Sequence, residues 1–534
     1  MSPGACANKQ STTRACFSPI PPPLPMAEAS MRFPKSLAWS ALWAAWGLFT
    51  GGCRAEVQGF QPPQQPGAAL HWPVAAPQPL AKRDPRLWLA LAAHLHPPEP
   101  LVLRSAKGSI SLISVSGQRL IAPELVFRWQ QQPLRQPLEL RRQVWGPFAS
   151  YESAQAASER WQRLGVSTKI AHPADWEVWA QANGPLPDTR PGDPPLRLWQ
   201  QKLGQRSVLV VRGPAPGFST PQTLVLDAPA RIEAPGGLRW QGGVYAGPFR
   251  LQSDATDRWT LVEQVPLERY LHGVVPFEIG AGAPVAALQA QAVLARTWAV
   301  RNQQRFEVDG YHLCADTQCQ VYGDPRAANA SVAKAIAATA GQVLSWQGKP
   351  IHAVYHATNG GVAAAFEEGW GGGPLPYLKP ALDASLGLQK QFPLPLQSGA
   401  LERWLAPGSS SPGAQAYGAD HPRYRWSRLI EAKHLEVLER GPSGRVLVLR
   451  IEGPKGVELL RLDAIRRRLK TLPSTLFVVQ PAGPGRWQLE GGGFGHGAGL
   501  SQAGAIDLAA RGWSLQRILE HYFPGASLRP LGSL

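Results

Sequence analysis

The chain has 534 residues, which is enough for two to four domains and at least one sizeable hydrophobic core. Charged residues are only 17% of it, while 54 glycines and 53 prolines exclude a coiled coil or a long helical array and indicate a loop- and strand-rich globular protein. The net charge of +17 favours anionic partners, but the basic residues are scattered arginines without a nucleic-acid-binding motif, so we expect no nucleic-acid partner.

The first 55 residues have the layout of an export segment with an upstream extension. In "MRFPKSLAWSALWAAWGLFTGGC", Arg32 and Lys35 precede an apolar run that is too short for a comfortable membrane span. The run ends in "TGGC", which resembles a bacterial lipobox with Cys53 as the lipidated residue. Cleavage after Ala55 and an uncleaved anchor are the alternatives. The sequence predicts an exported protein of the cell envelope or periplasm, held at the membrane by an N-terminal anchor or lipid.

Residues 56–97 are rich in proline and glutamine and predict an extended tether. Residues 98–264 follow as a strand-rich region, because apolar and polar residues alternate between glycine and proline turns. A small α/β insertion at about 138–182 interrupts it. Within this insertion, apolar residues at three- and four-residue spacing predict a helix from about Tyr151 to Leu164.

Residues 265–534 make up the predicted core domain. A strand and a short helical turn lead into the loop "PFEIGAGAP", and a long helix follows from about Pro284 with one face of small apolar residues, Leu288, Ala292, Ala295 and Ala299. Glu278 lies in that loop. From spacing alone, it is either a solvated side chain or an acceptor for free N–H groups at the helix start. The predicted fold class is α+β: a mixed catalytic domain with antiparallel strands and this long helix, a strand-rich subdomain and the insertion.

The segment "YHLCADTQC" holds the two cysteines outside the N-terminal region, Cys314 and Cys319. In an exported protein they can form a disulfide. Two thiolates with His312 nearby are equally suited to a structural zinc, for which His352 or His356 could supply a fourth ligand. Spacing does not choose between the two.

Two further polar clusters are candidates for a binding cleft. "YHATNGG" places polar side chains at a strand end beside a glycine turn, which is also ordinary turn chemistry. "GGGFGHGAGLSQAGA", residues 491–505, lacks the Gly-Lys-Ser/Thr of a phosphate loop. It also lacks the final glycine of a nucleophile elbow, because Ala503 stands there and Ser501 starts a predicted helix to Arg511. The run is therefore interpreted as a bare cleft wall rather than a serine hydrolase site.

Six segments occur in an order that resembles the SpoIID/LytB family of stage II sporulation protein D and amidase enhancers. They are "YLHGVVPFEI", "ALQAQAVLARTWAV", "CADTQCQVYGD", "YHATNGG", "GWGGGPLPYLKP" and "GFGHGAGLSQAGAIDLAARGWSLQRILEHYFPG". The resemblance covers roughly residues 207–524. It implies an exported protein acting on peptidoglycan, either as a lytic transglycosylase that cleaves between N-acetylmuramic acid (MurNAc) and N-acetylglucosamine (GlcNAc) to leave 1,6-anhydroMurNAc ends, or as a non-catalytic enhancer of a cell-wall amidase.

Glu278 matches the glutamate that family members use as catalytic acid and base. A single carboxyl is sufficient when the sugar's own 6-hydroxyl is the nucleophile, and protonation near neutral pH requires a pKa raised by apolar surroundings. The sequence departs from the family at Gly280 and Ala283, where a proline and a tryptophan are common. The lost tryptophan removes a surface for packing or sugar stacking.

The resemblance also implies the remaining site residues. The predicted cleft residues are Gln320, Tyr322, Tyr355, His356, Thr358, His496 and Ser501. Family members that bind zinc through Cys–x4–Cys move the prediction for Cys314 and Cys319 toward a structural zinc with His312, and no organic cofactor is expected. The insertion weakly resembles a SPOR domain, a module that binds peptide-free glycan strands, against the alternative of a generic α/β insertion.

Overall fold

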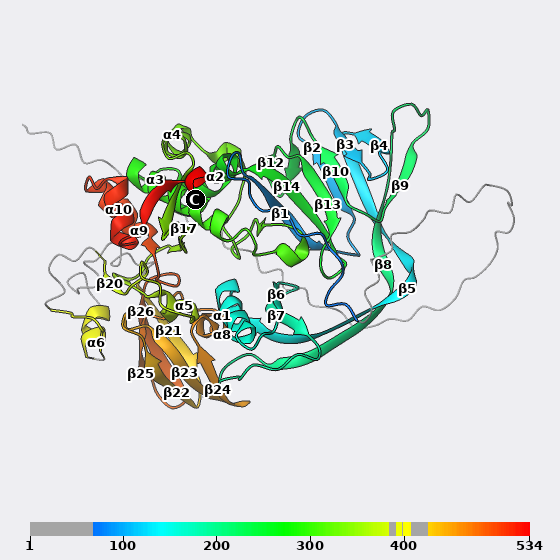
Figure 1. Cartoon of the computed structure of the whole chain (residues 1–534). Coiled ribbons are helices and arrows are strands. Elements are labelled where there is room, and N and C mark those ends of the chain that lie inside the picture. The colour runs from blue at the N-terminus through cyan, green and yellow to red at the C-terminus, as the bar shows by residue number, and fades with distance from the viewer. Residues whose placement is uncertain (1–67, 384–390, 398, 407–424) are drawn as a thin grey trace, which may run out of the picture. The chain divides into compact units, whose positions relative to one another are not determined.

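The computed structural model describes residues 68–383, 391–397, 399–406 and 425–534, which all belong to one compact unit, Gln58–Leu534 (Figure 1). The export segment predicted for residues 1–55 and the lipobox cysteine lie outside the described residues. Among the residues that are described, no helix is both long enough and apolar enough to cross a membrane. The mixture of helices and several antiparallel sheets confirms the predicted α+β class.

A seven-stranded sheet forms one large layer of the described structure. Its order is β15-β1-β14-β13-β10-β3-β4, and every neighbouring pair is antiparallel except β1 with β15. The strands are β1 (Arg86–Leu95), β3 (Ile110–Ile113), β4 (Arg119–Ala122), β10 (Ala230–Glu233), β13 (Phe249–Ser253), β14 (Trp259–Pro266) and β15 (Leu313–Cys314).

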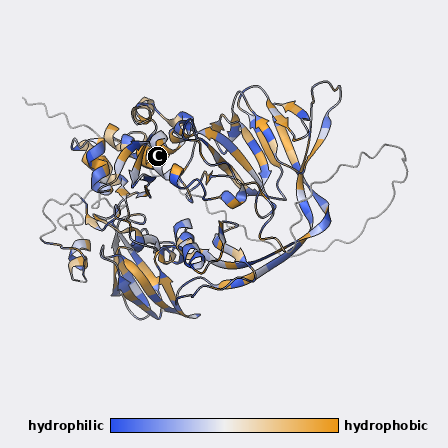
Figure 2. Ribbon diagram, viewed as in Figure 1, coloured by the Kyte–Doolittle hydropathy of each residue, from blue (hydrophilic) through white to orange (hydrophobic). Residues whose placement is uncertain are grey.

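The second large sheet contains eight strands in the order β12-β11-β2-β5-β7-β6, with β8 beside β5 and β9 beside β8. Apolar and polar residues alternate along many strands of both sheets, as expected when one face is buried (Figure 2). The strands are β2 (Leu101–Ser105), β5 (Glu124–Phe148), β6 (Thr168–Ala171), β7 (Trp176–Gln181), β8 (Leu196–Gly213), β9 (Gln222–Leu226), β11 (Leu238–Trp240) and β12 (Gly243–Tyr245).

Strand β1 corrects the predicted tether of residues 56–97. The segment "RLWLALAAHL" pairs with β14 along its length, and Leu87 and Leu89 are completely buried. Upstream of it, Trp72 is also completely buried and its backbone N–H donates to the carbonyl of Ala255. The described part of the tether is therefore integral to the fold, because its apolar side chains offset the entropy cost of ordering the chain.

The insertion forms a β-α-β-β unit from the end of β5, α1 (Tyr151–Gln162), β6 and β7. The predicted helix is confirmed and ends two residues early. Ser150 caps it by accepting the N–H of Ser153. The long β5–β8 ribbon connects this unit to the rest of the sheet (Figure 1).

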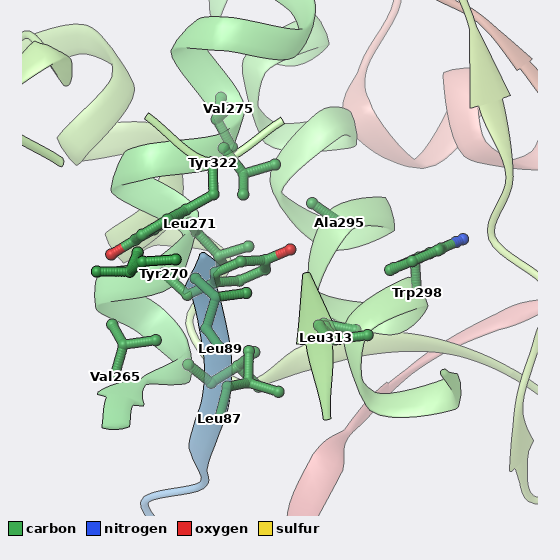
Figure 3. Packing of buried hydrophobic residues seen from close by; sticks show 14 of the residues in the cluster. Leu87, Leu89, Val265, Tyr270, Leu271, Val275, Ala295, Trp298, Leu313 and Tyr322 are labelled. Atoms are coloured by element: carbon green, nitrogen blue, oxygen red, sulfur yellow. The ribbon is translucent and has the colours of Figure 1, made fainter. Parts of the chain in front are cut away.

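The helices of the predicted core domain pack against the seven-stranded sheet. The main cluster of buried side chains includes Leu89 of β1, Leu271 of the helix after β14, and Ala295 of the long helix that follows (Figure 3). It therefore crosses the predicted boundary between residues 98–264 and 265–534, which share one core. The helices around it are α2 (Leu267–Val275), α3 (Val285–Arg301), α4 (Ala330–Ala338), α9 (Gln502–Ala510) and α10 (Leu515–Tyr522).

Residues 425–492 add two three-stranded antiparallel sheets, with strand orders β21-β26-β25 and β22-β23-β24. Trp426, Leu449 and Leu489 belong to a buried cluster of their own. This part of the predicted 265–534 domain thus has a separate core. Its elements are β21 (Arg425–Glu431), β22 (His434–Arg440), β23 (Val446–Gly453), β24 (Gly456–Arg461), α8 (Asp463–Arg468), β25 (Phe477–Pro481) and β26 (Arg486–Gly492).

Short elements complete the described fold. They are the strands β16 (Gln342–Trp346), β17 (Lys349–Pro350), β18 (Tyr355–His356), β19 (Val362–Ala363), β20 (Ala381–Leu382), β27 (Leu500–Ser501) and β28 (Ser527–Pro530), the helices α5 (Phe366–Trp370) and α6 (Ala400–Leu405), and the turns η1 (Pro276–Gly280), η2 (Glu307–Asp309), η3 (Pro325–Ala327) and η5 (Leu531–Ser533).

Candidate functional site

Glu278 lies on a π-helical turn, η1, that continues directly from α2. The turn starts at Pro276, whose ring nitrogen has no hydrogen to donate, so the α-helical bonding pattern cannot continue unchanged. It ends at Gly280 with φ +88°, a conformation that favours glycine and aims the chain toward α3. Such local widening is frequent at functional sites because it presents one side chain away from the regular helix surface.

The carboxyl group of Glu278 is partly buried and held by the backbone. The N–H of Val321 donates to Oε1 at 2.8 Å. Burial raises the pKa of Glu278 above its usual range, and interactions with Val321, Gln502 and Tyr355 partly oppose that rise. These causes include no cationic neighbour, so the local environment favours the protonated acid.

Glu278 lines a pocket of about 510 Å³. Three separate stretches of the chain build its walls: the insertion, the segment 278–370 of the core, and the C-terminal segment 463–496. The lining residues are Ala149, Ser150, Glu152, Glu278, Trp298, Arg305, Thr317, Gln318, Cys319, Gln320, Val321, Val354, Tyr355, Trp370, Asp463, Arg466, Arg467 and His496.

Gln320 and Tyr355 are two of the predicted cleft residues that reach this pocket. Gln320 is buried, and its Oε1 accepts the hydroxyl of Tyr270 at 2.9 Å. Burial and the nearby Glu278 charge raise the pKa of Tyr355 well above its usual range, so its hydroxyl stays protonated. Both side chains therefore border the acid as neutral polar groups.

His496 also lines the pocket, but the structure gives it a different role from a free sugar-binding group. Its Nε2–H donates to the carbonyl of Tyr355 at 3.0 Å, and its Nδ1 accepts the N–H of Ala498 at 3.2 Å. Burial lowers its pKa to about 4. The neutral imidazole thus ties the glycine-rich run to β18, and its ring lies tilted by 46° against Trp370, with ring centroids 4.6 Å apart.

Four other predicted cleft residues do not line the pocket, because their polar atoms face the protein interior. The Tyr322 hydroxyl donates to Glu263, the His356 ring bonds to the carbonyl of Ala498, Thr358 accepts the N–H of Gly360, and Ser501 caps α9 by accepting the N–H of Gly504. All four are buried. Their contacts support the walls of the site, so the structure does not bring these four predicted residues to the pocket.

The structure does not assemble the predicted zinc ligands. Cys314 and Cys319 form a disulfide. Both ring nitrogens of His312 are engaged by the backbone and are not available to a metal. Its Nδ1 accepts the N–H of Trp88 and its Nε2–H donates to the carbonyl of Gln78, both at 2.8 Å. Throughout the described residues, no group of three or more His, Cys, Asp or Glu side chains could hold a metal ion. These residues do not fit a zinc site, and the disulfide alternative holds.

Several pocket residues were not predicted from the sequence. Trp298 and Trp370 are large aromatic side chains that line the pocket and are mostly buried. Glu152 of the insertion and Arg305 form a buried bidentate ion pair, with N–O distances of 2.9 and 3.1 Å. No local pattern indicates these residues, because they approach one another only in the folded chain.

A family model described as "Stage II sporulation protein" matches residues 255–346, and one described as "Domain of unknown function (DUF8618)" matches residues 427–499. A stage II sporulation protein D of Bacillus amyloliquefaciens is 31% identical over 291 residues, which are 50% of this chain and 75% of that protein. The chain belongs to the SpoIID/LytB family. The family resemblance seen in the motifs is thereby confirmed.

Two further family members are each similar over about half of the chain. A stage II sporulation protein D of Bacillus subtilis (strain 168) is 27% identical over 287 residues, covering 50% of this chain and 75% of that protein. An amidase enhancer of the same organism is 27% identical over 290 residues, covering 48% of this chain but 40% of that protein. These relatives give the family a role related to the cell wall. The match to residues 427–499 coincides with the strand-rich part that has its own core.

Proposed function

We propose that this protein is a peptidoglycan lytic transglycosylase in which Glu278 is the single acid and base. One observation carries the proposal. The carboxyl group of Glu278 lines the pocket, burial raises its pKa, and the N–H of Val321 holds it in place. Departure of a glycosidic oxygen requires a proton donor, and a raised pKa lets the carboxyl group keep its proton to a higher pH.

The arrangement supports a two-stage proton transfer. Because Oε1 accepts the Val321 N–H, the proton of the neutral acid resides on Oε2. Glu278 gives this proton to the bridging oxygen as the bond from C1 of MurNAc to O4 of GlcNAc breaks. The resulting carboxylate then takes the proton of the 6-hydroxyl, whose oxygen bonds to C1 of the same MurNAc. The products are a free GlcNAc 4-hydroxyl and a 1,6-anhydroMurNAc end, and no water is consumed.

The state of the other carboxyl groups favours this route over ordinary hydrolysis. A conventional glycosidase needs a second carboxyl as base or nucleophile. Of the two others in the pocket, Glu152 is locked by Arg305, and Asp463 accepts hydroxyl hydrogen bonds from Ser150 and Ser153. Neither is held ready to activate a water or attack a sugar, so the internal 6-hydroxyl is the nucleophile that this site accommodates.

The substrate and the place of action belong to the same proposal. Trp298 and Trp370 offer aromatic surfaces for sugar rings, and the net charge of +17 suits an acidic wall polymer. The protein then acts outside the cytoplasmic membrane, held there through its N-terminal segment. The insertion lines one wall of the pocket, and its weak resemblance to a SPOR domain is consistent with glycan binding beside Glu278.

The deciding experiment digests purified, peptide-free glycan strands with the wild-type protein and with Glu278→Gln. We expect 1,6-anhydro-ended fragments, lighter than hydrolysis products by one water, from the wild type alone. Glu278→Gln keeps the size of the side chain but cannot donate the acid proton. Hydrolysed ends would overturn the transglycosylase mechanism, and equal products from both proteins would remove Glu278 from the chemistry.

A second candidate function follows from the similarity to an amidase enhancer. In that case the protein binds wall material and stimulates a separate cell-wall amidase without cleaving glycan itself. The same preparations distinguish the two. If neither wild type nor Glu278→Gln releases anhydro ends, yet both stimulate a purified wall amidase equally, the enhancer function replaces the enzymatic one.

A further inference from the structure

One arginine of the pocket differs from its neighbours in having no anionic partner. Arg305 pairs with Glu152, Arg467 pairs with Asp175, and Arg468 pairs with Glu458. Among the described residues, no ion pair or side-chain hydrogen bond involves Arg466, and its Nε is buried without a partner. Arg466 nevertheless lines the pocket that contains Glu278.

The surroundings of Arg466 explain why this is unusual. Burial lowers its pKa, and Asp463 opposes that shift only by charge at a distance. Asp463 itself is occupied by the hydroxyl groups of Ser150 and Ser153. Arg466 is half-buried, and a guanidinium partly withdrawn from water without a hydrogen-bonded anion is unfavourable in the folded protein. Such a cost is commonly found at sites where a ligand supplies the missing partner.

Arg466 does not serve as a counter-ion to the acid. Its charge lowers the pKa of His496, but it is not among the causes that set the pKa of Glu278. The pocket therefore contains Glu278, whose protonated form is favoured, and Arg466, a cation without an anionic partner. A ligand that spans the two must place a bond to be protonated near Glu278 and an anionic group near Arg466.

We infer that Arg466 binds a carboxylate of the substrate and thereby determines which glycan units enter the pocket. This inference rests on the proposed function, since it names the substrate group recognised at the same site. A planar guanidinium suits a carboxylate because it can donate two parallel hydrogen bonds. The carboxylate has two possible sources in peptidoglycan: the lactyl group of MurNAc when no peptide is attached, or the acidic groups of the stem peptide.

The experiment compares Arg466→Gln with wild type on three substrates. These are peptide-free glycan with free lactyl carboxylates, the same glycan after its carboxylates are converted to methylamides, and peptide-bearing glycan. We expect Arg466→Gln to lower kcat/KM on one carboxylate-bearing substrate by about tenfold to a hundredfold, the usual loss for a charge-assisted hydrogen bond. The substrate that shows the loss identifies the source. On the methylamide substrate, the variant and wild type should be equal.

Two variants keep the result interpretable. Arg466→Lys preserves the charge without the planar fork, so it should recover part of the lost activity. Arg468→Gln is the matched control, because Arg468 lies on the same helix, is exposed and pairs with Glu458. It should behave as wild type on every substrate. Equal losses of Arg466→Gln on the charged and methylamide substrates, or no loss at all, would overturn the inference.

A binding measurement separates this inference from the proposed function. Glycan fragments with free lactyl carboxylates and peptide-bearing fragments are titrated against Glu278→Gln and against Glu278→Gln/Arg466→Gln by calorimetry. A weaker affinity of the double variant for one carboxylate-bearing ligand, by about tenfold to a hundredfold, supports Arg466 even when the wild type makes no anhydro ends. If the two affinities are equal for both ligands, Arg466 does not bind a substrate carboxylate, whatever the reaction.

Discussion

The backbone N–H of Val321 donates a 2.8 Å hydrogen bond to Oε1 of Glu278. Val321 follows the short loop that the Cys314–Cys319 disulfide closes, and Cys319 itself lines the pocket. The position of the acid therefore depends on two features that lie far from it in sequence: a covalent loop closure and a backbone amide.

Cleavage should decrease as the pH rises through the pKa of Glu278. Burial raises that pKa, so the acid keeps its proton to a higher pH than an ordinary glutamic acid, whose pKa is about 4.3. In a profile of kcat/KM against pH, the midpoint of the decrease should lie above the pKa of an ordinary glutamic acid. A midpoint at or below it would contradict the role of burial.

Glu278→Gln should stabilise the fold, and the gain should grow with pH. The folded-state pKa is raised above the unfolded value, so stability is retained below the unfolded pKa and decreases as the pH rises through the folded pKa. Removing the charge should add about 0.5–2 kcal/mol near neutral pH. Urea unfolding at acidic and neutral pH measures this. The exposed Glu439→Gln serves as a control that should show no such gain.

Glu152→Ala should destabilise the protein by about 3–5 kcal/mol, because it leaves the buried guanidinium of Arg305 without its partner. Glu159→Ala, on the exposed side of the same helix, should change the free energy of unfolding by no more than about 0.5 kcal/mol. The double variant Glu152→Met/Arg305→Met should recover most of the loss, since neither charge remains. Chemical denaturation of all three compares them directly, and equal effects of the two single variants would contradict the ion pair.

Replacing Cys314 and Cys319 together by serine should lower stability by about 2 kcal/mol through the lost loop closure. It should also lower cleavage, because the loop before Val321 becomes free to move. When the wild type is alkylated without a reducing agent, mass measurement should find Cys314 and Cys319 unalkylated, because disulfide-bonded cysteines do not react. Free thiols together with one zinc per chain in elemental analysis would restore the metal alternative.

Gly499→Ala should destabilise the protein by about 2–5 kcal/mol. Gly499 has φ +73°, and an added Cβ would lie 2.2 Å from the carbonyl oxygen of Val354, so the substitution introduces both backbone strain and a clash. Gly512 has φ +82° with open space around it. Gly512→Ala should therefore cost only the strain, about 1–2 kcal/mol. Thermal unfolding of both variants separates the two effects, and equal losses would show that the close approach is unimportant.

Local sequence patterns were sufficient for several elements and for the choice of a candidate acid. The cap residues of α1 and α9, Ser150 and Ser501, each accept an N–H three positions away, so local patterns were sufficient for both helices. The ordered family segments indicated Glu278 among all the carboxyl groups. The tether was mispredicted because proline content outweighed the apolar run that becomes β1, whose pairing partner β14 lies far along the chain.

The set of residues that share the pocket follows from packing between distant segments of the chain. Glu152 comes from the insertion and Arg466 from the C-terminal strand-rich part, and no spacing rule connects them to Glu278. Likewise, the sequence could not tell that His312 would turn both ring nitrogens to backbone groups. Local sequence sets the conformation of nearby backbone, whereas the direction of a side chain and its neighbours depend on packing between distant segments.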